Sequence, residues 1–259
     1  MLTYTMDVLP ESIWLRTTPG ASAMGQPYVC TEAGQYLAQG HFSTARTHKE
    51  SYLLFYTLRG AGLIEQGDDR VLLRAGQALL MDCRKPQRYA TAPGQHCWHH
   101  DWVHLDGAGV AAMAEWLIPE GKLTPITLTD QKVEEQFKTI FAELESGTVD
   151  SMLQVSLALH QLLTLCAQGL LNQEQTESNQ QVIQQAAQTI REKYNQPLTL
   201  SDLLRQAHMS RSYFLRLFRR YMGTTPYKPV YKSAYVILDK GTSSRYTVSG
   251  NNFRTGGEA

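Results

Sequence analysis

The stretch QVIQQAAQTIREKYNQPLTLSDLLRQAHMSRSYFLRLFRRYMGTTPY, residues 181–227, decides how the C-terminal part of this chain folds. Its apolar residues recur every three or four positions, as they do on the packed face of an α-helix. They form three groups: Val182, Ile183, Ala186, Ala187 and Ile190; Leu200, Leu203 and Leu204; and Phe214, Leu217, Phe218 and Tyr221. We therefore expect three helices in this stretch.

Capping residues indicate where the second and third of these helices begin. Thr199 is a hydroxyl N-cap for the second helix, and the Asp202 carboxylate faces the positive end of that helix. Residues 207–209 form a short break, after which Ser210 can cap the third helix. The third helix is rich in arginine. This is the layout of a helix-turn-helix whose second helix enters a DNA major groove.

The distribution of charge supports a nucleic-acid partner, although the formal net charge of the chain is zero. Residues 181–259 hold twelve Lys and Arg against four Asp and Glu, a net charge of +8. Residues 1–180 hold twelve against twenty, a net charge of −8. A basic module joined to an acidic one is typical of a DNA-binding protein with a separate regulatory domain.

Other features of the sequence predict a soluble, cytoplasmic protein. The four cysteines are far apart and form no CxxC pair, so neither a disulfide framework nor a zinc site is indicated. The first residues lack the basic start and apolar run of a secretory signal. The most apolar segment, residues 155–171, is too short and too polar to span a membrane.

The N-terminal half has the pattern of β-structure. After residues 1–25, which we interpret as an N-terminal arm, short apolar runs alternate with turns, as in YLLFYTLRGAGLIEQGDDRVLLRAGQALLMDC, residues 52–83. Gly67-Asp68-Asp69 is a hairpin signal. The spacing of strands and turns predicts a small antiparallel barrel or sandwich within residues 26–107.

Helical patterns return within residues 108–171, at residues 110–117, 130–144 and 151–171. The last of these has a broad leucine face that either the barrel or a second subunit could cover, and we expect it to contribute to a homodimer interface. Residues 172–180, NQEQTESNQ, are uniformly polar and are interpreted as the interdomain linker.

Several motifs in both halves resemble the arabinose-regulator (AraC/XylS) family of transcription factors. On the C-terminal side these are Pro197-Leu198-Thr199-Leu200, Met209-Ser210 with Tyr213-Phe214, Arg216 and Phe218, and Gly223-Thr224-Thr225-Pro226-Tyr227. On the N-terminal side they are Gly60-Ala61-Gly62, Arg74-Ala75-Gly76-Gln77, Asp82-Cys83-Arg84-Lys85-Pro86 and Trp102-Val103-His104-Leu105-Asp106-Gly107. The resemblance implies an α+β chain of two domains, a cupin-like antiparallel β-barrel with C-terminal helices and then an all-α helix-turn-helix domain.

The resemblance also implies which residues carry the function of a ligand-responsive DNA-binding regulator. Arg211, Ser212, Leu215 and Arg216 correspond to positions of the recognition helix that face the bases, and arginine can pair bidentately with guanine. Arg219 and Arg220 are interpreted as phosphate contacts. For the small-molecule effector, the positions that line the cavity correspond to Arg46, Tyr89, His100 and Trp102. These suit a sugar, although Tyr89 and Trp102 could equally be core residues.

Two alternatives to a regulator stay open. A cupin enzyme would need a metal centre, and the HxH-plus-Glu group that builds one is absent around His48 and Glu50, so we expect no metal, no cofactor and no catalytic residues. The other alternative is a ligand-binding and dimerisation module that no longer binds DNA.

The C-terminal residues depart from the family pattern. A first helix-turn-helix is expected at residues 181–228, and a linker helix with a second helix-turn-helix should follow. Pro229 instead removes a backbone N–H where that helix would begin, and residues 229–259 are interpreted as an aberrant, poorly ordered remnant of a truncated or scrambled second motif. The expected consequence is reduced affinity for DNA.

Overall fold

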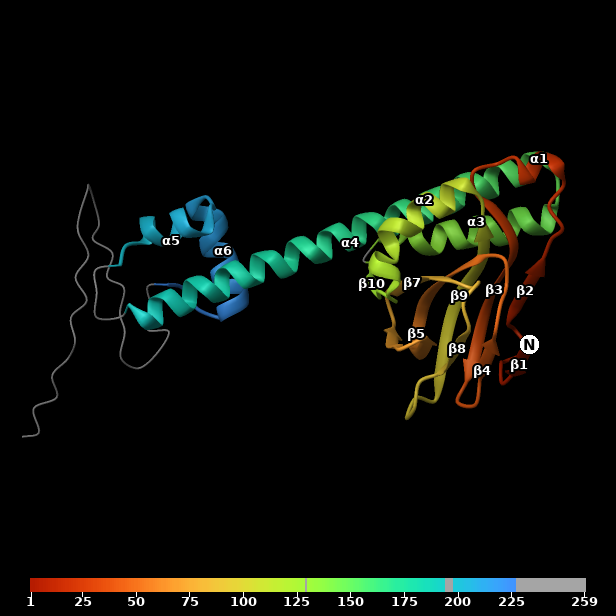
Figure 1. Ribbon diagram of the computed structural model, residues 1–259, viewed down its shortest axis with the longest axis horizontal. Helices are drawn as coiled ribbons and strands as arrows, with labels where there is room; N and C mark the ends of the chain where they lie inside the picture. The colour runs from red at the N-terminus through yellow and green to blue at the C-terminus, as the bar shows by residue number, and fades with distance from the viewer. Residues whose placement is uncertain (129, 194–197, 227–259) are drawn as a thin grey trace, which may run out of the picture. The chain divides into compact units, whose positions relative to one another are not determined.

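The computed structural model describes residues 1–128, 130–193 and 198–226, which form two compact units. Unit 1 comprises residues 1–173 and unit 2 begins at residue 174 (Figure 1). The prediction for residues 229–259 lies outside the described residues.

The described residues of unit 1 form an antiparallel sheet whose two halves share one long strand, β5 (Tyr52–Gln66). One half contains β1 (Leu2–Thr5), β4 (Ser43–Arg46), β8 (Gln87–Thr91), β5 and β6 (Asp69–Arg74). The other contains β2 (Ile13–Arg16), β3 (Val29–Gln39), β9 (Cys97–Asp106), β5, β7 (Gln77–Asp82) and β10 (Ile126–Thr127). The predicted hairpin joins β5 to β6, with Gln66 opposite Asp69 and Gly67 at a φ of 59°.

Strand β5 pairs with different strands along its two halves, and the glycines Gly60 and Gly62 lie where it bends between them. Its first half pairs with β7 and β9, and its second half pairs with β6 and β8. Gly60 has a φ of 75°, and a Cβ atom there would lie 2.0 Å from the Cys97 carbonyl oxygen. A Cβ atom at Gly62 would lie 2.3 Å from the Trp98 ring. Side chains at either position would therefore force β5 away from β9.

Helices cover one face of the sheet in unit 1 (Figure 1). They are α1 (Ala21–Met24), α2 (Ala108–Leu117), the 3-10 turn Pro119–Gly121, α3 (Lys132–Ser146) and the first part of α4 (Val149–Glu192). The core between sheet and helices includes Leu54, Val103, Phe137, Leu159 and Leu163, all almost fully buried. A second core lies inside the barrel and includes Phe42, Phe55, Ile64 and Trp98.

The N-terminal arm is part of the sheet rather than a separate segment. Strand β1 pairs with β4, and β2 pairs with β3. The sequence does not predict these strands, because four-residue strands are too short to show a lasting period and are held by backbone hydrogen bonds to their neighbours.

Unit 2 contains the three predicted helices, which are the end of α4, α5 (Leu200–Ala207) and α6 (Arg211–Met222). Thr199 caps α5 in a capping box with Asp202, and the Ser210 hydroxyl accepts a hydrogen bond from the Tyr213 N–H at the start of α6. The core of unit 2 consists of Ile183, Ala186, Ala187, Ile190, Leu198, Leu200, Leu203, Ala207, Phe214, Leu217 and Phe218. The helix starts and the packed faces predicted from the sequence are confirmed.

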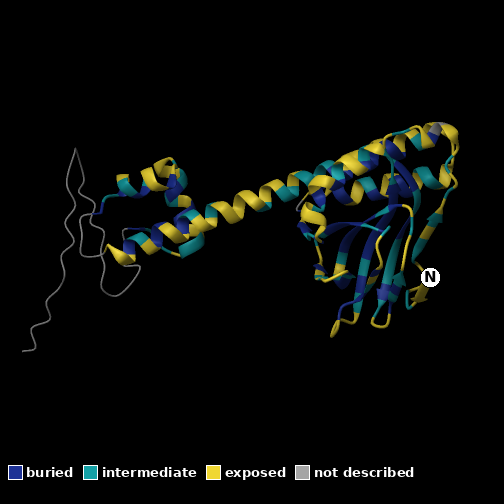
Figure 2. Cartoon of the chain, in the orientation of Figure 1, coloured by how far each residue is buried: buried dark blue, intermediate teal, exposed yellow. Residues whose placement is uncertain are grey.

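The predicted linker, residues 172–180, is helical and lies within α4. Most of its side chains are exposed, as Figure 2 shows for the middle of α4. The boundary between the two units follows residue 173, inside this segment. Polar composition alone therefore did not reveal that the segment is helical, because Glu and Gln are good helix formers on a solvated surface.

Candidate functional site

A cavity of about 350 Å³ lies inside the barrel of unit 1. It is lined by Leu2, Tyr4, Met6, Trp14, Arg16, Glu32, Tyr36, Thr44, Arg46, Leu53, Phe55, Tyr89, His100, Trp102 and His104. The four residues predicted to bind an effector, Arg46, Tyr89, His100 and Trp102, are all among them. The structure thus brings these four residues together, while their binding of a ligand stays a prediction.

Aromatic rings form much of the cavity wall. The Tyr36 and Trp102 ring centroids lie 5.2 Å apart, and those of Phe55 and Tyr89 lie 5.0 Å apart. Burial raises the pKa of Tyr36 to about 12, and it also raises the pKa of Tyr89, so both phenols stay protonated and can donate hydrogen bonds. Such a wall offers flat apolar faces with hydroxyl groups at their edges.

Two buried ring nitrogens of the lining residues have no hydrogen-bond partner among the residues that the structure describes. They are Nε2 of His100 and Nε1 of Trp102. The other nitrogen of His100, Nδ1, lies 2.9 Å from the Trp98 carbonyl oxygen. Burial lowers the pKa of His100 to about 3, so the ring is neutral. A neutral ring that donates from Nδ1 has an acceptor at Nε2. The Trp102 N–H is a donor, so the two unpartnered nitrogens are one acceptor and one donor.

Charged groups complete the cavity. Glu32 accepts a hydrogen bond from Lys49 at 2.7 Å and lies 3.7 Å from the Arg16 guanidinium. Arg46 makes no ion pair with any residue that the structure describes. Among the described lining residues, its guanidinium is therefore a cation that no carboxylate neutralises.

Residues of the N-terminal arm also line the cavity, which the sequence did not predict. Strands β1 and β2 supply Leu2, Tyr4, Trp14 and Arg16 to the cavity wall. His104 lines the cavity as well. It could have been predicted, because alternate residues of a strand share a face and His104 lies two residues beyond Trp102. The arm carries no such signal, because its short strands show no period.

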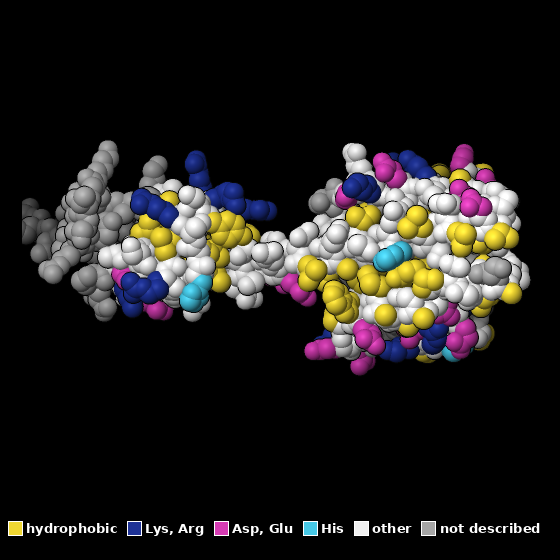
Figure 3. Space-filling model, turned by 90° about the horizontal axis from the view of Figure 1, so that it is seen from above, with side chains coloured by type: hydrophobic (Ala, Val, Ile, Leu, Met, Phe, Trp, Pro, Cys, Tyr) yellow, Lys and Arg dark blue, Asp and Glu magenta, His cyan; other side chains and the backbone are white. Residues whose placement is uncertain are grey.

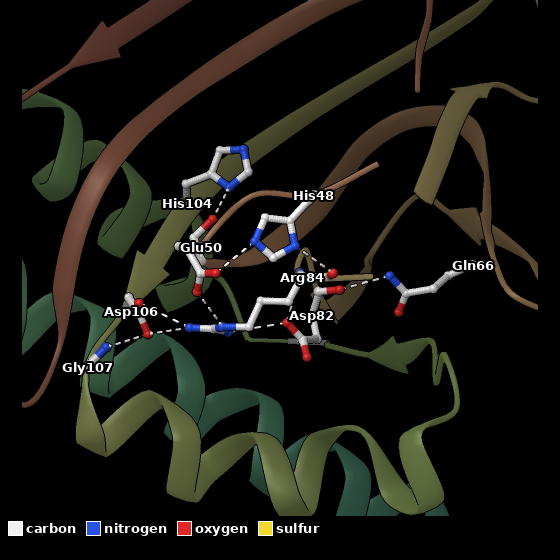
Figure 4. Close-up of polar contacts among 9 residues, drawn as sticks. His48, Glu50, Gln66, Asp82, Arg84, His104, Asp106 and Gly107 are labelled. Carbon is white, nitrogen blue, oxygen red and sulfur yellow. Dashed lines mark hydrogen bonds and ion pairs between the residues drawn. The ribbon is translucent and has the colours of Figure 1, made fainter. Parts of the chain in front are cut away.

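A polar network lies beside the cavity, where two of the motifs noted in the sequence meet (Figure 4). The Arg84 guanidinium contacts Glu50, Asp82 and Asp106 at 3.1 to 3.2 Å. Asp106 also accepts a hydrogen bond from the Gly107 N–H, just before α2. The network therefore joins the β7–β8 turn to the end of β9 and the start of α2.

The histidine and glutamate weighed as metal ligands belong to this network. His48 Nε2 lies 2.7 Å from Glu50, and Nδ1 lies 2.9 Å from the Arg84 carbonyl oxygen. Both ring nitrogens are thus engaged. Within residues 1–128, 130–193 and 198–226, no group of three or more His, Cys, Asp or Glu is arranged to hold a metal ion.

The second candidate site is the outer face of α6 in unit 2. Arg211, Ser212, Arg216, Arg219 and Arg220 are exposed and Leu215 is half-buried, while Phe214, Leu217 and Phe218 face the core. None of the four arginines makes an ion pair with the described part of the chain, and Figure 3 shows basic side chains on the surface of this unit. The face is therefore free to contact an anionic partner, and the predicted DNA-contacting roles stay predictions.

The described residues contain no helix that is both long enough and apolar enough to cross a lipid bilayer.

Two family models match the chain. A model of the AraC-like ligand binding domain matches residues 29–163, and a model of bacterial regulatory helix-turn-helix proteins of the AraC family matches residues 190–226. The first match covers more than half of the chain, and it includes the strands that build most of the cavity. Together with the curled antiparallel sheet, the matches confirm the predicted fold class.

Individual relatives are distant. The Msm operon regulatory protein of Streptococcus mutans serotype c is 23% identical over 187 residues, which make up 69% of this chain. The chain spans just under two thirds, 66%, of the length of that relative.

Among solved structures, the chain is similar to the cupin domain of an XRE family transcriptional regulator from Enterobacter cloacae, with 12% identity over 36% of this chain and 95% of that one and a TM-score of 0.28. It is also similar to a cupin superfamily protein from Desulfitobacterium hafniense, with 12% identity over 37% of this chain and 78% of that one and a TM-score of 0.28.

The strand that carries His100 and Trp102 also buries a carboxyl group on its opposite face. Asp101 is only 2% exposed, and its Oδ1 accepts a hydrogen bond from Gln35 at 2.8 Å. Burial raises the pKa of Asp101 from 3.8 to about 7. Because the folded pKa exceeds the unfolded one, this group destabilises the fold increasingly as the pH rises from about 4 to about 7.

We expect Asp101→Asn to remove this pH dependence. Relative to the unaltered chain, its free energy of unfolding should rise by on the order of 2–3 kcal/mol between pH 5 and pH 8, measured by chemical denaturation. The matched control is Glu135→Gln, which changes an exposed carboxyl group on α3. Its free energy of unfolding, relative to that of the unaltered chain, should not change with pH. If the same difference for Asp101→Asn were also independent of pH, the prediction would be wrong.

Proposed function

The chain belongs to the AraC family of bacterial regulatory proteins, and from this membership we propose that it is a ligand-responsive, DNA-binding transcription regulator. The observation that carries the proposal is that the matched ligand-binding domain holds an aromatic cavity whose lining residues include two unpartnered ring nitrogens, one acceptor and one donor, and a cation, Arg46, that has no ion pair among the described residues. The matched helix-turn-helix presents four arginines that lack ion pairs with described residues. These are the two sites that such a regulator needs.

The effector in this proposal is a sugar. A sugar hydroxyl can donate to His100 Nε2 and accept from Trp102 Nε1, which would satisfy both unpartnered nitrogens. The aromatic rings can stack on the C–H face of the sugar, and Arg46 can bind further hydroxyls. Binding would shift the arm strands, because Tyr4 and Trp14 line the same cavity.

Replacement of Trp102 by Phe tests the effector proposal. Trp102→Phe keeps an aromatic face but removes the donor, so the affinity for the sugar should fall by roughly five- to tenfold, the effect of about one lost hydrogen bond. The measurement is calorimetric titration with a panel of pentoses and hexoses. Trp116→Phe changes an indole that is 61% exposed outside the cavity and serves as the control.

The same titration also tests whether the effector belongs to another chemical class. If no sugar binds but an aromatic or aliphatic carboxylate does, the Arg46 cation selects an anion and the sugar assignment is wrong. If neither class binds, the cavity is not an effector site.

DNA binding in this proposal depends on α6. Arg211, Ser212, Leu215 and Arg216 would contact base edges in the major groove, and Arg219 and Arg220 would contact phosphates. One helix-turn-helix, matched at residues 190–226, reads one major-groove segment. The proposal therefore includes a low affinity of a single chain for a single site.

Two arginine variants separate base reading from phosphate contact. Arg216→Ala should reduce discrimination between the preferred site and other DNA by about 1–3 kcal/mol. Arg219→Ala should weaken binding to all sequences. It should also reduce, by about one, the slope of the logarithm of the binding constant against the logarithm of the salt concentration. Both are measured by fluorescence anisotropy over a salt series, on a site selected from random DNA. Absence of any DNA binding would favour a ligand-binding and dimerisation module instead.

A homodimer through α4 would bring two such helices to one operator. Leu153 is 46% exposed and Leu157 is 52% exposed on successive turns of α4, and Leu171 further along is 53% exposed. Figure 3 shows the hydrophobic side chains that gather on the face of unit 1 seen from above. A second copy that buries this face would raise the effective concentration of the second DNA-binding unit.

Replacement of the exposed leucines tests the dimer. The double variant Leu153→Gln and Leu157→Gln should sediment as a monomer at concentrations where the unaltered chain sediments as a dimer, because the apolar surface that drives association is lost. The side chains are exposed in a single copy, so the helical signal in circular dichroism should not change. Gln154→Ala, between the two leucines, is the control. An unaltered chain that sediments as a monomer would contradict the proposal.

A further inference from the structure

Two tyrosines of α6 bind the segment of α4 that the sequence suggested to be a linker. The Tyr213 hydroxyl accepts a hydrogen bond from Asn179 Nδ2 at 3.0 Å. The Tyr221 hydroxyl donates to the Thr176 carbonyl oxygen at 3.4 Å. All four residues belong to unit 2, so the beginning of this unit is joined to its basic helix by two polar contacts in addition to the apolar core.

Each of these tyrosine rings also supports an arginine. The Arg216 guanidinium carbon lies 5.2 Å from the centroid of the Tyr213 ring, and that of Arg220 lies 5.7 Å from the Tyr221 ring. Both are cation–π contacts. Neither arginine has an ion pair among the described residues, so the cation–π contact with the ring is one that limits the freedom of its long side chain. A ring fixed by a hydrogen bond limits that freedom more than a ring free to move.

We propose that Asn179 and Tyr213 are positioning residues that orient Arg216 for reading a base pair. The proposal rests on the proposed function, in which Arg216 contacts base edges. Asn179 fixes the Tyr213 hydroxyl, the fixed ring holds the guanidinium, and the guanidinium meets the DNA already oriented. A bidentate contact with guanine depends on the orientation of the planar guanidinium, so its discrimination between bases depends on this support.

The second tyrosine provides an internal comparison. Tyr221 has the same two contacts, one to α4 and one to an arginine, but Arg220 is assigned to a phosphate. A phosphate contact carries no sequence information and tolerates more than one orientation of the guanidinium. The same loss of a hydroxyl should therefore alter base discrimination at Tyr213 and only general affinity at Tyr221.

The test uses the full chain and the DNA site selected from random sequences. Tyr213→Phe removes the hydrogen bond but keeps an aromatic ring at position 213. Asn179→Ala removes the same hydrogen bond and leaves the whole tyrosine in place. Each should reduce discrimination at the base pair read by Arg216 by about two- to fivefold, with the salt slope unchanged. Because both variants break one bond, the double variant should lose no more discrimination than either single variant.

The matched control is Tyr221→Phe, which should leave discrimination at every base pair unchanged. Arg216→Ala, measured on the same DNA, identifies the base pair concerned. Thermal denaturation of each variant separates positioning from a structural role, since loss of folding would weaken binding to all sequences alike.

Each outcome supports or overturns the positioning role of Asn179 and Tyr213. If Arg216→Ala reduces discrimination but Tyr213→Phe and Asn179→Ala do not, the positioning role is wrong and the proposed function stands. If the two variants weaken binding uniformly, or if Tyr221→Phe reduces discrimination equally, the role of Tyr213 is structural. If the chain has no sequence preference, or Arg216→Ala leaves it intact, the assignment of Arg216 and the positioning role both fail.

Discussion

The barrel of unit 1 depends on the close approach of strand β5 to the Trp98 ring. Gly62 leaves no Cβ atom between them, and the Trp98 Nε1 donates a hydrogen bond to the Thr57 hydroxyl at 3.0 Å, with both side chains fully buried. The indole N–H has a hydrogen-bond partner and the ring is packed on its faces. Strand β5 bends over this ring and pairs with different strands on either side of the bend. The two halves of the sheet share β5, and this contact region lies where that strand bends from one half to the other.

The same tryptophan determines the chemistry of the cavity. The His100 ring stacks on Trp98 with centroids 3.8 Å apart, and its Nδ1 bonds to the Trp98 carbonyl oxygen. These two contacts fix both the plane and the tautomer of His100 and leave Nε2 as the acceptor. The packing around Trp98 that accompanies the bend of β5 therefore also determines the orientation of His100 in the cavity wall.

Local signals in the sequence predicted a large part of this structure. The Thr199 capping box and the period of Leu200, Leu203 and Phe214 depend on neighbouring residues, so they could be identified without the fold. The resemblance to regulators identified Arg46, Tyr89, His100 and Trp102, which line one cavity. The contacts that were missed join residues far apart in the chain, such as Asn179 with Tyr213, and such pairs leave no periodic signal.

The arm strands differ from the rest of the cavity wall in how they are held. Strand β1 is attached to β4 by backbone pairing, while Leu2 is 45% exposed and Tyr4 is 63% exposed. Trp14 on β2 is likewise 54% exposed, although it lines the cavity. Side chains held in this way contribute little to the core, so they can be exchanged at small cost in stability. The arm is thus the part of the cavity wall whose side chains can vary most between related chains, while the buried strands keep the barrel intact.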